Sequence, residues 1–257
     1  MRVLNRRIMA LFVLCFIFLS VFPAATSLAD EMQYNPTVVS DKFEGWVMAA
    51  GFTVSSGILK NSWSNINGTC YYDNVIWSGK YTYQANIFNE GGNDANKVCL
   101  IFNYIDSSKY YYISFGGTNT NTVQLMKKSG TSDIEIKKYE GNYPIRTRSP
   151  YTTVKIDYDN GVINVKGIKN GSETVLFENV NDTTYTSGKV GIATSSSVGE
   201  FSNISVKGNG TNILLNKLSS NISENEEGVS VSTNIKILFD KEIDSASLTK
   251  NNIIMKT

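Results

Sequence analysis

The sequence contains no histidine among its 257 residues. That absence excludes Ser-His-Asp and Cys-His catalysis, histidine-ligated zinc and histidine-based pH switching. An excess of charge of one sign is also missing, because 24 basic side chains are matched by 23 acidic ones. A near-neutral surface gives no electrostatic basis for binding nucleic acid or an anionic membrane.

Long apolar runs are missing from all but the N-terminus. Three arginines precede an apolar run from Ile8 to Phe22 and a tail of small residues that ends at Ala29. This pattern predicts a secretory signal peptide over residues 1–29 rather than a membrane span. Its removal leaves 228 residues with 21 basic and 23 acidic side chains, a net charge of −2. No later run approaches the roughly 18 apolar residues that cross a bilayer, so we expect a secreted protein, extracellular or on the cell surface.

Cysteine is scarce as well. Of three cysteines, Cys15 falls in the predicted signal peptide, and Cys70 and Cys99 remain. In an exported chain these two thiols could form a disulfide worth roughly 3 kcal/mol. The alternative is that both are small core residues, since strand geometry can forbid the bridge.

Short alternating runs, separated by Gly, Asn and Asp, fill the chain from Ser40 to Lys207 without a sustained helical period. In Tyr81–Ile87 the odd positions are apolar or aromatic and the even ones polar, which is typical of a strand with one solvated face. Asn160-Gly161 and Asn170-Gly171 provide the positive-φ residues of tight hairpins. The pattern predicts an all-β, antiparallel domain.

Several segments carry a family resemblance. They are Asp41–Trp46, Gly57–Leu59, Trp77–Tyr81, Leu100–Asp106, Lys109–Phe115, Gly188–Ala193 and Glu200–Val206. Together they resemble the concanavalin A-like, laminin G-like jelly-roll modules of secreted bacterial carbohydrate-active proteins, over nearly all of residues 38–207. The resemblance implies a two-sheet antiparallel jelly-roll sandwich over residues 30–207, with carbohydrate bound on the concave sheet or at the loop edge.

A sugar site needs aromatic rings for C–H faces and planar polar groups for hydroxyls. Residues 71–112 hold eight of the fourteen tyrosines. If Tyr111 points to the core, the pleat places Tyr110 and Tyr112 on the opposite face. The predicted binding residues are Tyr72, Trp77, Gln84, Asn103, Tyr110, Tyr112, Arg146 and Arg148. The alternative is structural, because tyrosine is a good strand former.

Arg146 and Arg148 alternate along an extended segment between two prolines. Their guanidinium groups could hold vicinal hydroxyls or a uronate carboxylate, or else be solvated in a loop. The family resemblance also implies a structural calcium near the first and last strands. Asp41, Glu44 and Glu200 match those regions, although many relatives have Asp after the phenylalanine where this chain has Ser202.

Paired carboxylates on one strand would indicate a retaining glycosidase. The glucanase pattern Glu-x-Asp-x-x-Glu does not occur; Asp133–Lys138 lacks its third acid, and Glu242–Ser247 ends in serine. Asp157 and Asp159 share a strand face, a common feature of strands that enter a turn. These features favour a non-catalytic protein.

The composition changes after Val206. Gly208–Asn212 predicts a flexible linker, which we extend over residues 208–217. Val229–Leu248 resembles the first half of bacterial Ig-like domains, so residues 218–257 are expected to form part of such a domain. Its ~40 residues fall short of the ~100 of a complete Ig-type sandwich, which indicates a longer multidomain protein.

The sequence thus predicts a secreted, non-catalytic module that binds an extracellular or plant-type polysaccharide or cell-wall glycan. Two alternatives remain. One is a cell-surface adhesion or spacer module without sugar specificity. The other is a fragment of a glycoside hydrolase or polysaccharide lyase whose catalytic part lies elsewhere.

Overall fold

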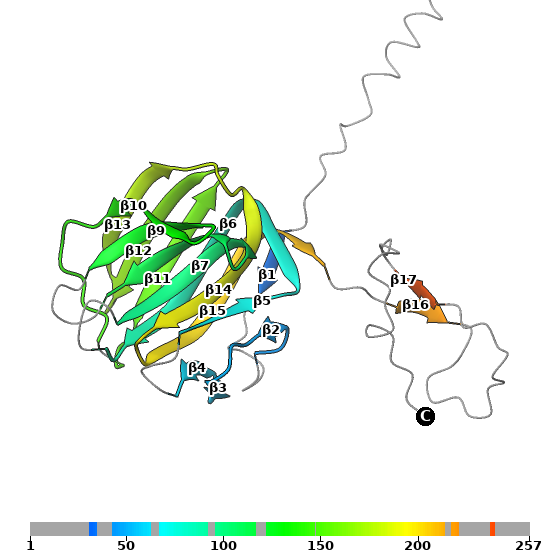
Figure 1. Cartoon of the computed structure of the whole chain (residues 1–257), viewed down its shortest axis with the longest axis horizontal. Coiled ribbons are helices and arrows are strands. Elements are labelled where there is room, and N and C mark those ends of the chain that lie inside the picture. Colours follow the sequence, from blue (N-terminus) through cyan, green and yellow to red (C-terminus); the bar gives the residue numbers. More distant parts are fainter. Residues whose placement is uncertain are drawn as a thin grey trace, which may run out of the picture.

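A computed structural model describes residues 31–34, 43–62, 67–91, 96–116, 122–146, 148–213, 217–220 and 237–239. Every regular element in these ranges is a β-strand, which confirms the all-β prediction (Figure 1). No helix within the ranges has the length and apolar character needed to cross a membrane. The predicted signal peptide and most of the expected Ig-like segment lie outside the described residues.

Two antiparallel sheets form the main body (Figure 1). Sheet A runs in the order β3 (Phe52–Ser55), β4 (Ile58–Asn61), β15 (Gly199–Asn212), β6 (Val75–Asn89), β11 (Thr152–Asp159), β12 (Val162–Lys169) and β13 (Ser172–Asn181), with β1 (Glu31–Tyr34) also paired to β15. Sheet B runs in the order β10 (Ser132–Lys138), β9 (Val123–Ser129), β8 (Lys109–Phe115), β7 (Lys97–Asp106), β14 (Ser187–Ser195), β5 (Gly68–Tyr72) and β2 (Trp46–Val47). The first residues of β14 also pair with β6, which joins the two sheets at one side. A further pair, β16 (Lys217–Ser220) and β17 (Ile237–Phe239), forms its own small sheet.

One face of each sheet packs into a shared core. In β6 the predicted alternation is confirmed, since Tyr81, Tyr83, Ala85 and Ile87 are buried while the residues between them are half-exposed. Sheet B contributes alternate side chains from β7, β8, β9 and β14, such as Phe102 of β7. Burying one side chain of this size contributes roughly 1.5–3 kcal/mol, so the core accounts for the pairing of the sheets.

The two predicted hairpin turns are present. Asn160 and Gly161 have φ of 48° and 96° between β11 and β12, and Asn170 and Gly171 have φ of 53° and 76° between β12 and β13. Both central residues of each turn are therefore left-handed, as a two-residue hairpin with the right twist requires.

The linker prediction at Gly208–Asn212 is wrong. These residues are the end of β15 and pair with β6, from Gly208 opposite Tyr81 to Asn212 opposite Val75. A Cβ atom at position 208 would lie 2.5 Å from the Lys80 carbonyl oxygen, and one at 210 would lie 2.8 Å from the Trp77 ring. The glycines thus allow close packing of two strands, which composition alone does not distinguish from a flexible segment.

The two cysteines are both unbridged. Cys70 faces the core, whereas Cys99 lies on the outer face of sheet B, because β14 aligns Ile192 with Cys70 but Ala193 with Cys99. Side chains on opposite faces of one sheet cannot meet, so the alternation that builds the core forbids the disulfide.

Candidate functional site

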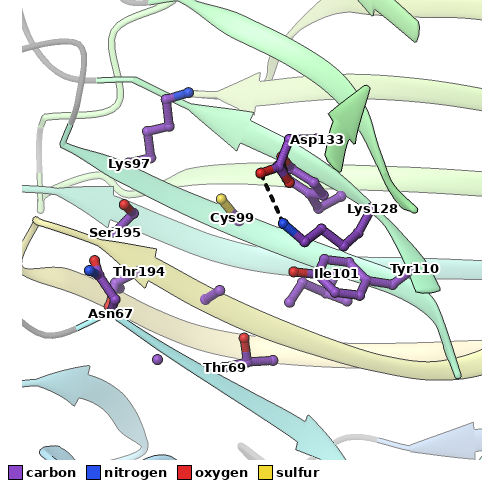
Figure 2. Close-up of a pocket in the computed structure, with 13 residues that line it drawn as sticks. Asn67, Thr69, Lys97, Cys99, Ile101, Tyr110, Lys128, Asp133, Thr194 and Ser195 are labelled. Carbon is purple, nitrogen blue, oxygen red and sulfur yellow. Dashed lines mark hydrogen bonds and ion pairs between the residues drawn. The ribbon is translucent and has the colours of Figure 1, made fainter. Parts of the chain in front are cut away.

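The outer face of sheet B carries a pocket of about 470 Å³. Figure 2 shows side chains from β5, β7, β8, β9, β10 and β14 around it. They are Asn67, Gly68, Thr69, Lys97, Cys99, Ile101, Tyr110, Tyr112, Lys128, Asp133, Ala193, Thr194 and Ser195. The pocket thus combines apolar, aromatic and charged groups on one sheet face.

Short side chains form the floor of this pocket. Ala193 of β14 lies in register with Thr69 on one side and Cys99 on the other. Burial raises the pKa of the Cys99 thiol to about 12, so it stays protonated and unreactive at neutral pH. A row of small residues between larger neighbours leaves a hollow, which is why the depression forms here.

Tyr110 and Tyr112 of β8 line the pocket beside this floor. They alternate with Tyr111, which is fully buried, so the predicted register of this strand is confirmed. Their ring centroids lie 5.7 Å apart at an interplanar angle of 51°. Both rings remain half-exposed, which leaves aromatic surface available to a ligand.

An ion pair lies beside Tyr112 at one end of the pocket. Asp133 of β10 accepts a hydrogen bond from the Tyr112 hydroxyl at 2.8 Å and pairs with Lys128 Nζ at 3.0 Å. Burial, followed by the nearby Asp133 carboxylate, raises the pKa of Tyr112, and burial raises the pKa of Tyr110 to about 12. Both phenols are therefore neutral hydrogen-bonding groups at physiological pH.

The aromatic surface continues beyond the pocket as a row of four tyrosines, Tyr71, Tyr104, Tyr110 and Tyr112. Ring centroids are 4.6 Å apart between Tyr71 and Tyr104, and 5.6 Å between Tyr104 and Tyr110. Lys189 Nζ lies 5.3 Å from the Tyr71 ring centroid and also pairs with Asp73. This tyrosine row is packed ring against ring, which limits the motion of Tyr110 beside the pocket.

A bulge in β7 brings Tyr104 into the row. Asn103 has a φ of 47°, and the register of β7 against both neighbours shifts at this point. Its side-chain amide accepts a hydrogen bond from the Tyr81 hydroxyl and donates one to the Tyr185 carbonyl, each at 2.7 Å. Asn103 is thus held inward, and the next residue turns to the outer face.

Gly188 completes the bulge from the neighbouring strand. A Cβ atom at this position would lie 2.3 Å from the Asn103 carbonyl carbon and 2.6 Å from the Tyr104 nitrogen. Only glycine lets β14 approach β7 so closely.

Three predicted binding residues lie away from the pocket. Trp77 is fully buried with its ring tilted against Tyr81, so this ring is not available to stack on a sugar. Asn103 is also fully buried, with both ends of its amide bonded inside the protein. Tyr72 is 9% exposed and stacks on Tyr34 at 3.8 Å. Strand alternation turned Trp77 and Tyr72 to the core, and the β7 bulge turned Asn103 there; all three support the fold.

The other predicted residues are on separate surfaces. Gln84 lies on the outer face of sheet A, in a shallow hollow beside Lys155. Arg146 is exposed and donates a hydrogen bond to the Glu90 carbonyl at 3.0 Å. Arg148 lies 4.0 Å above the Phe88 ring and binds the Glu200 carboxylate at 3.1 Å. The arginines are therefore used within the protein rather than at the pocket.

Of the three acids expected to bind calcium, the structure describes Glu44 and Glu200. Glu200 is 6% exposed, and its carboxylate accepts hydrogen bonds from Arg148 and, at 2.7 Å, from the Tyr151 hydroxyl. Glu44 is exposed, and Asp41 lies outside the described residues. The described part of the chain contains no cluster of three His, Cys, Asp or Glu side chains suited to a metal. Glu200 does not fit a calcium site, because an arginine already balances its charge.

Sequence reasoning missed most of the pocket and, in the adjoining tyrosine row, Tyr71 and Tyr104. Tyr71 and Lys128 follow the same alternation that placed Tyr112, so extending that pattern to β5 and β9 identifies them. Tyr104 has no such signal, because the bulge at Asn103 shifts the alternation of inward and outward side chains in β7 by one residue. Lys97 and Asp133 become neighbours of the site only through the order of strands in sheet B.

No family model matches this chain, and no curated protein matches it. Solved structures do. The carbohydrate binding module CBM66 from Bacillus subtilis is similar with a TM-score of 0.52 and 15% identity, over 62% of this chain and 93% of that one. The Ca²⁺/Man2-bound form of the VIP36 exoplasmic/lumenal domain gives 0.52 and 11%, over 81% and 96%. A Bauhinia forficata lectin in complex with GalNAc gives 0.52 and 10%, over 72% and 100%. At these identities the likeness establishes the fold, which is the lectin-like, two-sheet jelly roll.

Proposed function

We propose that this protein is a carbohydrate-binding module and that the pocket on the outer face of sheet B is its binding site. The observation that carries this proposal is the half-exposed pair Tyr110 and Tyr112 beside a hollow with a small-residue floor. Tyrosine rings suit the C–H faces of a sugar, and the polar side chains around them suit its hydroxyls. The structural neighbours that are named as a carbohydrate-binding module and as lectins support the same class of ligand.

The polar groups around the pocket are arranged for binding. Tyr112, Asp133 and Lys128 hold one another through bonds of 2.8 and 3.0 Å, so their orientation is set before a ligand arrives. Asn67 and Ser195 line the opposite end (Figure 2). A site organised in this way loses little side-chain entropy when it binds.

We also propose an extracellular or cell-surface location, with residues 1–29 as the secretory signal peptide. The ligand is then an extracellular or plant-type polysaccharide or a cell-wall glycan. An Ig-like region over 218–257 and a longer multidomain protein remain part of the proposal. A structural calcium also stays a proposal, supported by the Ca²⁺-bound forms among the structural neighbours, with Asp41 and Glu44 as its ligands here.

The test is retention of the purified protein on a panel of insoluble polysaccharides, followed by a glycan array. We expect retention on a subset of polysaccharides, with release by the matching soluble oligosaccharide. Retention on none, with a folded protein, would instead favour the adhesion or spacer module.

A further inference from the structure

The charges at the pocket are not balanced. Three charged side chains line it, Lys97, Lys128 and Asp133. Lys128 and Asp133 neutralise each other at 3.0 Å, and Lys128 Nζ also donates to the Thr131 carbonyl at 3.3 Å. Lys97 has no carboxylate within ion-pairing distance among the residues that the structure describes, so the described lining carries one positive charge more than negative.

The unbalanced lysine lies at the opposite end of the pocket from the ion pair. Figure 2 shows Lys97 on one side of Cys99 and the Lys128–Asp133 pair on the other. Lys97 is the first residue of β7, is half-buried and aligns with Ser195 of β14. Its charge opposes the effect of burial on the pKa of the Cys99 thiol, which indicates that its field reaches the pocket floor.

Another basic group of this face, Lys189, is already paired. Lys189 pairs with Asp73 and lies over the Tyr71 ring. On the acidic side, Glu135 of β10 accepts a hydrogen bond from Gln124 and does not line the pocket. An incoming anion therefore meets, at the Lys97 end, a cation with no carboxylate partner among the described residues, and at the Asp133 end a carboxylate already paired with Lys128.

From this arrangement we propose that the sugar recognised in the pocket is acidic, with a carboxylate or sulfate group that pairs with Lys97 while the ring lies against Tyr110 and Tyr112. The inference rests on the proposed function of the same site. A lysine ammonium is a compact point charge that accepts either anion, unlike the planar fork of an arginine. A half-buried cation gains more from a counter-ion than an exposed one, because water screens it less.

The experiment compares acidic and neutral polymers. Affinity electrophoresis would measure retardation by polygalacturonate, by a sulfated galactan and by a neutral galactan, at low and high salt. We expect at least one acidic polymer to bind about tenfold more tightly than the neutral one, with the advantage falling as salt rises. The uronate and sulfate arms distinguish the two sources of the anion.

Two variants test the role of Lys97. Lys97→Gln should lose the tenfold preference for the acidic polymer over the neutral one, while Lys97→Arg keeps the preference. Lys166→Gln removes the same charge from the outer face of sheet A, where Lys166 pairs with Glu173 at 2.9 Å, and should change neither affinity. Thermal unfolding checks that each variant is folded, and the salt dependence of the unmodified protein gives a second, mutation-independent readout.

The outcomes separate the inference from the proposed function. Equal binding of acidic and neutral polymers, or equal losses in Lys97→Gln and Lys166→Gln, would overturn the acidic-sugar inference and leave the sugar site in place. Absence of binding to these three polymers and to every polysaccharide of the wider panel would overturn both. Loss of the acidic preference in Lys97→Gln, with the preference kept in Lys97→Arg and Lys166→Gln, supports the inference.

Discussion

The two outer faces of the sandwich each carry a hollow of similar size, yet they differ in what they present. The hollow on sheet B measures about 470 Å³ and that on sheet A about 450 Å³. On sheet A the polar groups bind one another, as Thr82 donates to Asp157 at 2.5 Å and Lys155 pairs with Asp157 at 3.1 Å. On sheet B the Tyr110 and Tyr112 rings are half-exposed.

The two tyrosines beneath the sheet A hollow point into the core rather than to the outer face. Tyr81 and Tyr158 are 2% and 1% exposed, with hydroxyl groups bonded to Asn103 and Tyr185 inside the core. Cavity volume therefore does not distinguish the two faces, whereas the direction of the aromatic residues does. The pleat of each strand decides which face receives the rings.

The largest expected effect comes from the core side of β8. Tyr111→Ala should lower the free energy of unfolding by about 3–5 kcal/mol, because it empties a fully buried aromatic site. Tyr110→Ala, one residue away on the outer face, should cost far less and is the matched control. Urea unfolding of both variants measures the difference. Equal losses would show that the two faces of β8 are not distinct.

A smaller effect is expected at the bulge that shapes the outer face of sheet B. Asn103→Ala should cost about 2–3 kcal/mol, since it leaves the Tyr81 hydroxyl without its partner, removes one of the two hydrogen bonds to the Tyr185 carbonyl and places alanine at a positive φ. It should also weaken polysaccharide binding, because Tyr104 loses its position in the tyrosine row. Asn164→Ala on β12 of sheet A is the control. Unchanged stability would contradict the structural role of Asn103.

The next effect is a pH dependence on the core side of sheet B. Burial opposes ionisation of Asp182, but hydrogen bonds from Lys127, Thr184 and Tyr111 outweigh it and lower its pKa to about 2. Because the folded pKa lies below the unfolded value of about 3.9, ionised Asp182 stabilises the protein above pH 4, and this contribution is lost as the pH falls from about 4 to 2.

The contribution of Asp182 amounts to about 2 kcal/mol at neutral pH. Asp182→Asn should therefore reduce stability at pH 7 and flatten the stability curve between pH 4 and 2, as followed by urea unfolding. Asp159→Asn, whose carboxylate is half-exposed on sheet A, provides the comparison and should leave the curve almost unchanged. A curve for Asp182→Asn parallel to that of the unmodified protein would refute this account of Asp182.

The fold was predictable where a single strand carries its own signal. The alternation in β6 and β8 and the Asn-Gly turns at 160 and 170 predicted the sheet faces and hairpins correctly. The signals failed where two strands act together. Gly208 and Gly210 resemble a linker in composition but permit close strand packing.

The candidate site was predictable only in part, for the same reason. Tyr110 and Tyr112 lie on one strand, and the pleat places both. Trp77 and Asn103 have side chains suited to sugar, but burial removes them from any ligand. Tyr104 reaches the outer face through a bulge that depends on Gly188 of another strand. Residue type identified the chemistry, whereas position depended on contacts distant in sequence.

Polysaccharide affinity of matched outer-face variants tests the central claim most directly. One variant is Tyr110→Ala/Tyr112→Ala on sheet B, and the other is Thr82→Ala/Lys155→Ala on sheet A. On a polysaccharide that retains the unmodified protein, isothermal titration should show a loss of about tenfold or more for the sheet B variant, since each lost ring contact is worth about 1 kcal/mol. The sheet A variant should bind as tightly as the unmodified protein. Unchanged affinity in the tyrosine variant, with the loss appearing in the sheet A variant, would place the binding site on the outer face of sheet A and contradict the account.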